Sequence, residues 1–94
     1  MLPRVRSDER GLILEANDAA LRLINPGLVG RHWHEFVIPG STEQVNTVID
    51  MIRSAGSAVS RYRMPSADGS LIEFDSYTRV DGDVLTTIIR PVDG

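Results

Sequence analysis

The sequence predicts an α+β domain in which helices precede most of an antiparallel sheet. Three observations support this fold class. Apolar residues recur at helical spacing in 41–55, hydrophobicity alternates with a period of two after Gly56, and Asp-Gly pairs separate the later segments. The chain has 94 residues and contains no repeat or low-complexity tract. We therefore expect a single domain over 1–94, either complete or part of a longer protein.

The first half of the chain is predicted to hold short elements. The run Gly11–Ala16 is short and apolar, which favours a strand. Asn17 is a good helix N-cap, because its side-chain oxygen can accept a bond from a free backbone N–H, and a helix over Asp18–Ile24 should follow. Pro26 cannot continue that helix. The stretch Leu28–Gly40 is too apolar for a solvated loop, so we expect one or two short helical turns there.

The longest predicted helix spans Ser41–Ala55. Ser41 and Gln44 have the spacing of a capping box, in which the first turn satisfies its own free N–H groups. Gly56 stands where a helix favours a left-handed residue after its end. The helix should pack on the sheet through one apolar stripe. This stripe consists of Val45, Val48, Ile49 and Ile52.

Strands are predicted in the segments that follow this helix. They are rich in Val, Ile, Tyr, Phe and Thr, and they span Ala58–Met64, Ser70–Thr78 and Val84–Arg90. Turn signals at Asp68-Gly69 and Asp81-Gly82 separate them. Because such dipeptides favour tight hairpins, the segments should form an antiparallel meander.

Alternating hydrophobicity assigns the inner face of the second strand of this meander but not that of the last strand. Ile72 and Phe74 should point inward, because Glu73 and Asp75 alternate with them and prefer water. In the last strand both faces are apolar, so periodicity does not assign them. These faces are Val84-Thr86-Ile88 and Leu85-Thr87-Ile89. A strand covered on both sides suggests an interface on its outer face.

Composition limits the functions that the chain can have. It contains no cysteine and no lysine, and its 10 basic residues are all arginine. Disulfides, thiolate chemistry, Schiff bases and a P-loop lysine are therefore excluded. The net charge is −3 and the arginines form no cluster, so nucleic acid is not an expected partner. No apolar run approaches the roughly 20 residues that cross a bilayer, so we expect a cytoplasmic protein without a membrane partner.

Four stretches together resemble a known family. Asp8–Asn17 has the pattern of a turn, a strand and a helix-capping Asn, and Leu28–Arg31 that of a step before the middle helices. Asp68-Gly69-Ser70 forms a turn signal, and Val80–Val92 a closing strand. In this order they resemble the PAS family over nearly the whole chain. The resemblance implies a five-stranded antiparallel sheet of order 2-1-5-4-3, helices packed on one face around a small cavity, and a first strand in Leu2–Ser7.

The resemblance also bears on cofactors. Flavin photosensors of the family carry a cysteine in a Gly-Arg-Asn-Cys-Arg motif, and Trp33 stands at the matching position within residues 30–34. Adduct photochemistry is therefore excluded. Haem-binding members take a histidine from the long helix, and Ser41–Ala55 contains none. His32 and His34 are a weak metal signal, because no third ligand accompanies them at suitable spacing, and no metal is predicted. A small organic ligand stays open.

In this fold the core and the cavity wall are largely the same surface, so each candidate wall residue can also be a plain core residue. The candidate ligand-binding residues are Leu21, Trp33, Phe36, Val45, Val48, Ile49, Ile52, Tyr62, Met64, Phe74 and Ile88. Ser76, Thr78 and Thr86 would add polar contacts if they face inward, although threonine is also simply a good strand residue.

Three functions are consistent with the sequence. The resemblance favours a sensory signalling domain, as in transcription regulation or two-component systems, which binds a small molecule, relays the signal to an output domain or partner protein, and forms a homodimer. The alternative is a ligand-free interaction module whose interior is filled by Trp33. A small α+β enzyme would need an inward carboxylate or histidine with a perturbed pKa, and Glu73 or Asp75 facing inward would be the sign of it. No nucleophile elbow, zinc motif or P-loop is present, so no catalytic residue is predicted.

Overall fold

The computed structural model describes the backbone of residues 1–36 and 42–92, and their side chains except at 34 and 42–46. Its five strands form one antiparallel sheet in the order β2-β1-β5-β4-β3, which confirms the predicted topology. The elements along the chain are β1 (Arg4–Ser7), β2 (Ile13–Ala16), α1 (Asp18–Leu23), the 3-10 turn η1 (Trp33–Glu35), α2 (Thr42–Ala55), β3 (Ser57–Pro65), β4 (Leu71–Asp81) and β5 (Val84–Pro91).

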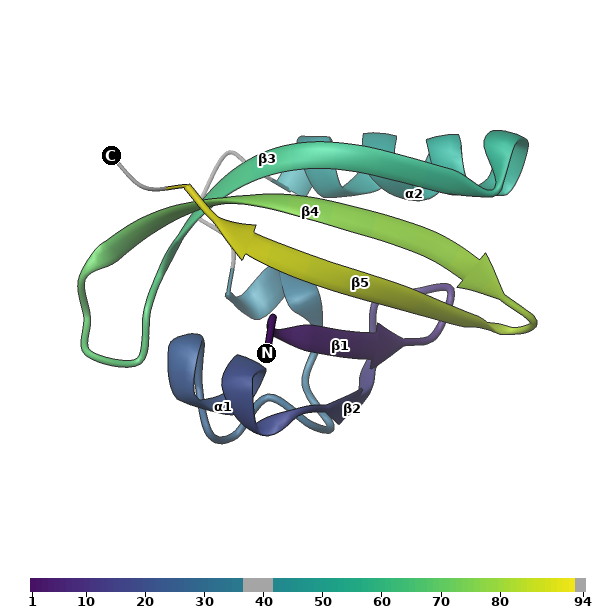
Figure 1. Ribbon diagram of the computed structural model, residues 1–94. Helices are drawn as coiled ribbons and strands as arrows, with labels where there is room; N and C mark the ends of the chain where they lie inside the picture. The colour runs from purple at the N-terminus through teal and green to yellow at the C-terminus, as the bar shows by residue number, and fades with distance from the viewer. Residues whose placement is uncertain (37–41, 93–94) are drawn as a thin grey trace.

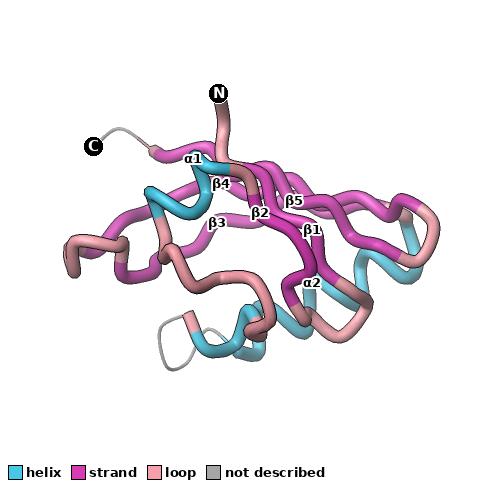
Figure 2. Tube along the Cα trace, turned by 90° about the horizontal axis from the view of Figure 1, so that it is seen from below, coloured by secondary structure: helices cyan, strands magenta, loops and turns pink. Residues whose placement is uncertain are grey.

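The helices pack on one side of this sheet. Figure 1 looks onto the sheet and shows α2 passing behind β3. Figure 2, from below, shows the strands as one layer and α2 as a second layer beside it. The other face of the sheet is therefore not covered by any described helix. Within the described residues, no helix has the length and apolar character that a membrane crossing needs.

Asn17 explains why α1 begins where it does. Its Oδ1 accepts a hydrogen bond from the Ala20 backbone N–H at 3.0 Å, which is the predicted N-cap. The same oxygen accepts from the Arg4 N–H at 3.0 Å, and Nδ2 donates to the Leu2 carbonyl at 3.0 Å. One side chain therefore starts the helix and also fixes the strand β1 beside it.

The predicted turns after β3 and β4 are confirmed. Gly69 and Gly82 have φ angles of 88° and 68°, which side chains with a Cβ rarely adopt. At the first turn, the Asp68 carboxylate accepts hydrogen bonds from the hydroxyls of Ser66 and Ser70 and from the Ser70 N–H. These bonds, led by that of Ser66, lower the pKa of Asp68 to about 2.

Several predicted boundaries move by a few residues. The first two strands begin at Arg4 and Ile13, later than predicted, and β4 continues to Asp81. The predicted long helix is confirmed over Thr42–Ala55, while Ser41 and its capping box with Gln44 lie outside what the structure describes. Of the irregular stretch before it, η1 is a single helical turn, and 37–40 also lie outside the described residues.

The buried side chains form two clusters. The larger one lies between α1 and the sheet and consists of Val5, Ile13, Ala20, Ile24, Leu28, Met64, Phe74 and Ile89. The smaller one lies under α2 and consists of Val48, Ile52, Ala58 and Leu85. Tyr62 packs against both clusters, so the boundary between them lies at this residue.

Candidate functional site: a cavity between two core clusters

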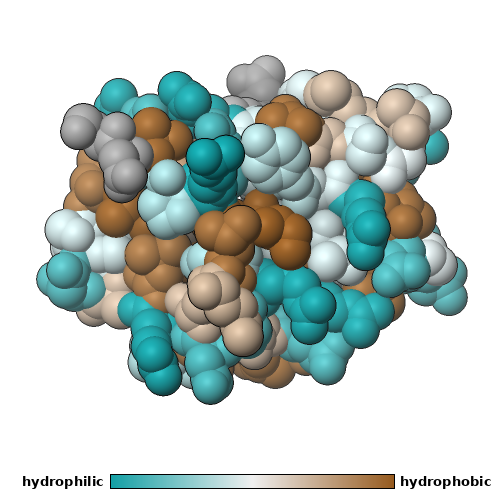
Figure 3. All heavy atoms as spheres, viewed as in Figure 1, coloured by the Kyte–Doolittle hydropathy of each residue, from teal (hydrophilic) through white to brown (hydrophobic). Residues whose placement is uncertain are grey.

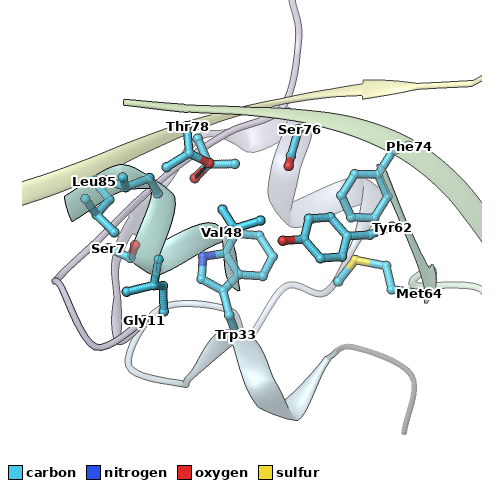
Figure 4. A pocket seen from close by; sticks show the side chains of 13 residues that line it. Ser7, Gly11, Trp33, Val48, Tyr62, Met64, Phe74, Ser76, Thr78 and Leu85 are labelled. Carbon is cyan, nitrogen blue, oxygen red and sulfur yellow. Dashed lines mark hydrogen bonds between the residues drawn. The ribbon is translucent and has the colours of Figure 1, made fainter. Parts of the chain in front are cut away.

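A cavity of about 60 Å³ lies between α2, η1 and the inner face of the sheet. Residues of both core clusters line this cavity, so it lies at the boundary between the two clusters. Figure 4 shows the side chains around this space. The lining residues are Ser7, Gly11, Trp33, Val48, Ile49, Ile52, Tyr62, Met64, Phe74, Ser76, Thr78, Leu85 and Thr87.

Strand pairing brings these side chains to one face. Tyr62 on β3 pairs with Phe74 on β4, and Thr78 on β4 pairs with Thr87 on β5. Directly opposite residues in an antiparallel pair point to the same face, and every second residue along a strand does so too. Ser76 therefore lies between Phe74 and Thr78 on the inner face of β4.

One end of the cavity is apolar and aromatic. The rings of Tyr62 and Phe74 are tilted by 33° with centroids 5.8 Å apart, which is a favourable aromatic geometry. Met64 is fully buried beside them. Burial raises the pKa of the Tyr62 hydroxyl, so this group is protonated at neutral pH and can donate a hydrogen bond. In Figure 4 it points toward the middle of the cavity.

The other end carries aliphatic hydroxyls. The Oγ1 atoms of Thr78 and Thr87 lie 3.0 Å apart in a buried hydrogen bond. Ser76 Oγ donates to the Ser60 carbonyl at 3.4 Å. Ser7, on β1, is 2% exposed and lines the same space.

Trp33 lies across the cavity and is held there by its backbone. Its N–H donates to the Gly11 carbonyl at 3.0 Å, and Leu12 forms a bridge with His32. Gly11 has a φ of 93°, so the chain turns at this point in a way that favours glycine. Glu35 stabilises the turn that carries Trp33, because its Oε2 accepts from the His32 N–H at 2.9 Å.

No carboxylate, guanidinium or imidazole is among the described residues that line the cavity. The nearest acidic residues of β4 face the other way. Glu73 accepts a hydrogen bond from Arg63 at 3.1 Å, and Asp75 accepts one from Arg61 at 2.8 Å, both on the outer face of the sheet. The Arg61 hydrogen bond lowers the pKa of Asp75. The inward carboxylate that an enzyme hypothesis needed at these positions is therefore not there.

This arrangement of sheet and helices is similar to that of known solved structures. The PAS-B domain of Drosophila melanogaster Cycle with bound ethylene glycol has a TM-score of 0.84 and 16% identity, covering 97% of this chain and 100% of that one. The PAS domain of the Cronobacter turicensis RpfR quorum-sensing receptor in complex with BDSF has a TM-score of 0.83 and 14% identity, covering 98% and 94%. The chain has the PAS fold.

A third similar structure is the PAS domain of a LuxR-family transcriptional regulator from Burkholderia thailandensis in complex with ethanol. Its TM-score is 0.78 at 19% identity, with 99% of this chain and 90% of that chain covered. No protein-family model matches the sequence, and no curated protein sequence matches it either. The likeness therefore concerns the fold.

Within this PAS fold, the structure brings most of the candidate wall residues together. The cavity is lined by Trp33, Val48, Ile49, Ile52, Tyr62, Met64 and Phe74. Leu21 and Phe36 pack against the larger core cluster without lining the cavity. The side chain of Val45 lies outside the described part of the structure.

Ile88 and Thr86 require a correction. Both lie on the outer face of β5, where Ile88 pairs with Tyr77 and Thr86 with Arg79. The inner residues of this strand are Leu85, Thr87 and Ile89, and Ile89 is fully buried. Both faces of the strand are apolar in sequence, so only its pairing register decides which one is inside.

Sequence reasoning missed Ser7, Gly11, Leu85 and Thr87 as wall residues. A signal for Thr87 was present. Once Asp81 pairs with Val84 across the predicted turn, Thr78 must pair with Thr87. Phe74 was predicted to point inward, and Thr78 lies four residues further along the same strand, so both threonines should point inward too. No comparable local signal marks Ser7 or Gly11, because they reach the cavity through pairing of β1 and through contact with Trp33.

Proposed function

We propose that this PAS-fold domain is a sensory domain that binds a small molecule in the cavity and relays binding to an output domain or a partner protein. The observation that carries the proposal is the cavity itself, which joins an aromatic end to a hydroxyl-lined end inside the fold. Ligand sites in proteins are typically apolar clefts with a few placed polar groups. Similar structures in complex with BDSF and with ethanol support this reading.

The position of the cavity suggests how binding would be relayed. Val48 and Ile52 of α2 belong to the smaller core cluster, and Met64 and Phe74 belong to the larger one. A ligand between the clusters changes how α2 packs on the sheet, because packed side chains shift as units and transmit strain. Leu85 and Thr87 of β5 line the cavity, so the same change reaches the strand whose other face is outside.

The chain contains its own probes for a binding experiment. Trp33 is the sole tryptophan and lines the cavity, so its fluorescence reports on this site. Of the 3 methionines, Met64 is a wall residue, whereas Met1 and Met51 are exposed. With carbon-13 methyl labels, a ligand in the cavity should shift the Met64 signal and leave the Met1 and Met51 signals in place.

The test begins with native mass spectra of the purified protein, followed by ethanol and ethylene glycol titrations read by Trp33 fluorescence and methyl NMR. A bound mass, or a saturable change confined to Met64 and Trp33, supports the proposal. A bare chain mass together with unchanged Met64 and Trp33 signals for both probes contradicts a ligand-binding cavity. Equal shifts at all methionines indicate a solvent effect and also contradict it.

One observation favours a second function, homodimerisation through the outer face of the sheet. Val59, Tyr77 and Ile88 form a row across β3, β4 and β5, each directly opposite the next. Val59 and Tyr77 are 61% and 45% exposed, and Figure 3 shows apolar side chains near the middle of this face, bordered by hydrophilic ones. Apolar side chains grouped on a surface often mark an interaction site.

We propose a second copy of the chain as the occupant of this face. The border of the row carries both charges, with arginines such as Arg79 and carboxylates such as Asp75 and Glu73. A two-fold pairing can set these charges against each other, because such an interface is self-complementary. Analytical ultracentrifugation should find a concentration-dependent dimer that Tyr77→Glu abolishes. Val29 is exposed outside the sheet, so Val29→Glu should leave the dimer intact; a monomer at all concentrations contradicts this function.

A further inference from the structure

We infer that the cavity selects a small neutral molecule with a short aliphatic body and one hydroxyl or carbonyl group at its end. This inference rests on the proposed sensory function and names the chemical class of its ligand. It follows from three properties of the wall: free hydrogen-bonding capacity at one end, the absence of ionised groups among the described lining residues, and the small volume.

The hydroxyl end has hydrogen-bonding capacity that the fold does not use. A hydroxyl can donate one hydrogen bond and accept two. In the bond between Thr78 and Thr87, only one of the two hydrogens is consumed. The buried Ser7 also lines this space and adds a third hydroxyl to the same end. Buried polar groups in proteins are nearly always satisfied, so a ligand group or water that can donate and accept fits this end.

The wall disfavours an ionised ligand. Burying a carboxylate or an ammonium group is costly unless an opposite charge accompanies it. The described lining residues are apolar side chains, Gly11, hydroxyls and the Trp33 indole. The Tyr62 hydroxyl, whose pKa is raised by burial, carries no charge at neutral pH. A neutral head group loses only the hydrogen bonds that it made to water, and the hydroxyls of Ser7, Thr78 and Thr87 can replace these.

The opposite end sets the shape and size of the ligand body. Tyr62, Met64 and Phe74 provide an apolar surface without a charged group. One water needs about 10–15 Å³ of such a cavity, so the volume of about 60 Å³ leaves room for roughly four to six non-hydrogen atoms. Trp33 limits the space, because its indole lies across the cavity (Figure 4). An alcohol or ketone with about four carbons fits this description.

The experiment compares three probes with the same four-carbon chain: 1-butanol, butyrate and butylammonium. Binding is read from Trp33 fluorescence and the Met64 methyl signal, with Met51 as the internal control. We expect 1-butanol to bind saturably, and both ions to bind more than about 10-fold more weakly, because they lack a counter-charge. Butyrate or butylammonium binding as tightly as 1-butanol would overturn the inference.

Adjacent threonines provide a matched pair of variants. Thr87 and Thr86 are each 7% exposed, but Thr87 lines the cavity and Thr86 lies on the outer face. Thr87→Val should weaken 1-butanol binding by about 3- to 10-fold, which corresponds to the typical net contribution of one hydrogen bond. Thr86→Val should leave it unchanged. Equal effects of the two substitutions would overturn the role assigned to the hydroxyl end.

The outcomes also separate this inference from the proposed function. If an ion binds best and shifts Met64, the cavity is a ligand site and only the neutral class is wrong. If none of the three probes shifts Met64 or Trp33, the ligand class is wrong. The sensory function fails as well if, in addition, the purified protein has its bare chain mass and neither ethanol nor ethylene glycol changes the Met64 or Trp33 signal.

Discussion

The hydrogen bond between Thr78 and Thr87 leads to a quantitative prediction about stability. Replacing either threonine by valine keeps the side-chain shape and removes one hydroxyl. The other hydroxyl is then left in a buried position without its partner, which typically costs about 1–3 kcal/mol. We expect the low end, about 1 kcal/mol per single variant, because the hydroxyl that stays still borders the cavity and can reach water there.

The double variant should behave differently from the sum of the two. Replacing both partners by apolar groups of the same shape is nearly neutral, since no unpaired hydroxyl is left. We therefore expect Thr78→Val/Thr87→Val to be within about 0.5 kcal/mol of the original protein, which gives a coupling energy of about 2 kcal/mol. In a domain of this size each single variant should lower the Tm by roughly 4–8 °C.

The free energy of unfolding in urea, followed by Trp33 fluorescence and far-ultraviolet circular dichroism, is compared for the original protein, the two single variants and the double variant. Thr86→Val is the control, because Thr86 is equally buried but lies on the outer face of the sheet. Additive effects, with a coupling energy below about 0.5 kcal/mol, would show that the two hydroxyls do not act as a pair. A double variant as stable as the original would show that the fold does not need the pair, which leaves ligand recognition as its role.

Three further predictions concern Asn17 at the start of α1, Asp68 in the turn after β3, and Phe74 in the cavity wall. Asn17→Ala should lower the free energy of unfolding in urea by about 1–3 kcal/mol, whereas Asn17→Asp, which keeps both acceptor bonds, should cost less; equal losses would contradict the bridging role. The pKa of Asp68 is about 2 in the folded protein against 3.8 ordinarily, so its stabilisation is present above pH 3.8 and lost as the pH falls toward 2. The Tm difference between the original and Asp68→Asn should shrink over this range, and a constant difference would contradict it. Phe74→Ala should destabilise by about 3–5 kcal/mol, because Phe74 is 2% exposed in the core, and a smaller loss in the same urea assay would mean that the cavity is already loosely packed.

Local signals predicted the parts of the fold that depend on neighbouring residues. Asn17 caps α1 because its side chain reaches a backbone N–H of the first turn, and this needs no distant partner. Gly69 and Gly82 set turns through their own backbone angles. The apolar stripe of α2 needs only the period of a helix, and Val48, Ile49 and Ile52 do line the cavity. Such features are encoded within a few positions of the sequence.

Features that depend on pairing between distant segments were harder to predict. Ile88 and Ile89 are chemically equivalent neighbours, and the register with β4 alone decides that Ile89 is buried and Ile88 faces outward. Ser7 reaches the cavity because β1 pairs with β5, which lies far along the chain. Asn17 also has a second, long-range role, since the same oxygen that caps α1 accepts from Arg4. Local periodicity contains none of this information.

The same register makes β5 the physical link between the two proposed functions. Leu85 and Thr87 face the cavity, while Thr86 and Ile88 face the outer side, so a single strand contributes to both sites. If a ligand alters the position of β5, it changes the surface on which a second copy would dock. Linkage then requires reciprocity. The factor by which the ligand changes dimer affinity must equal the factor by which dimerisation changes ligand affinity. The two functions are therefore compatible, and a dimer constant that is equal with and without bound 1-butanol would show that β5 does not couple them.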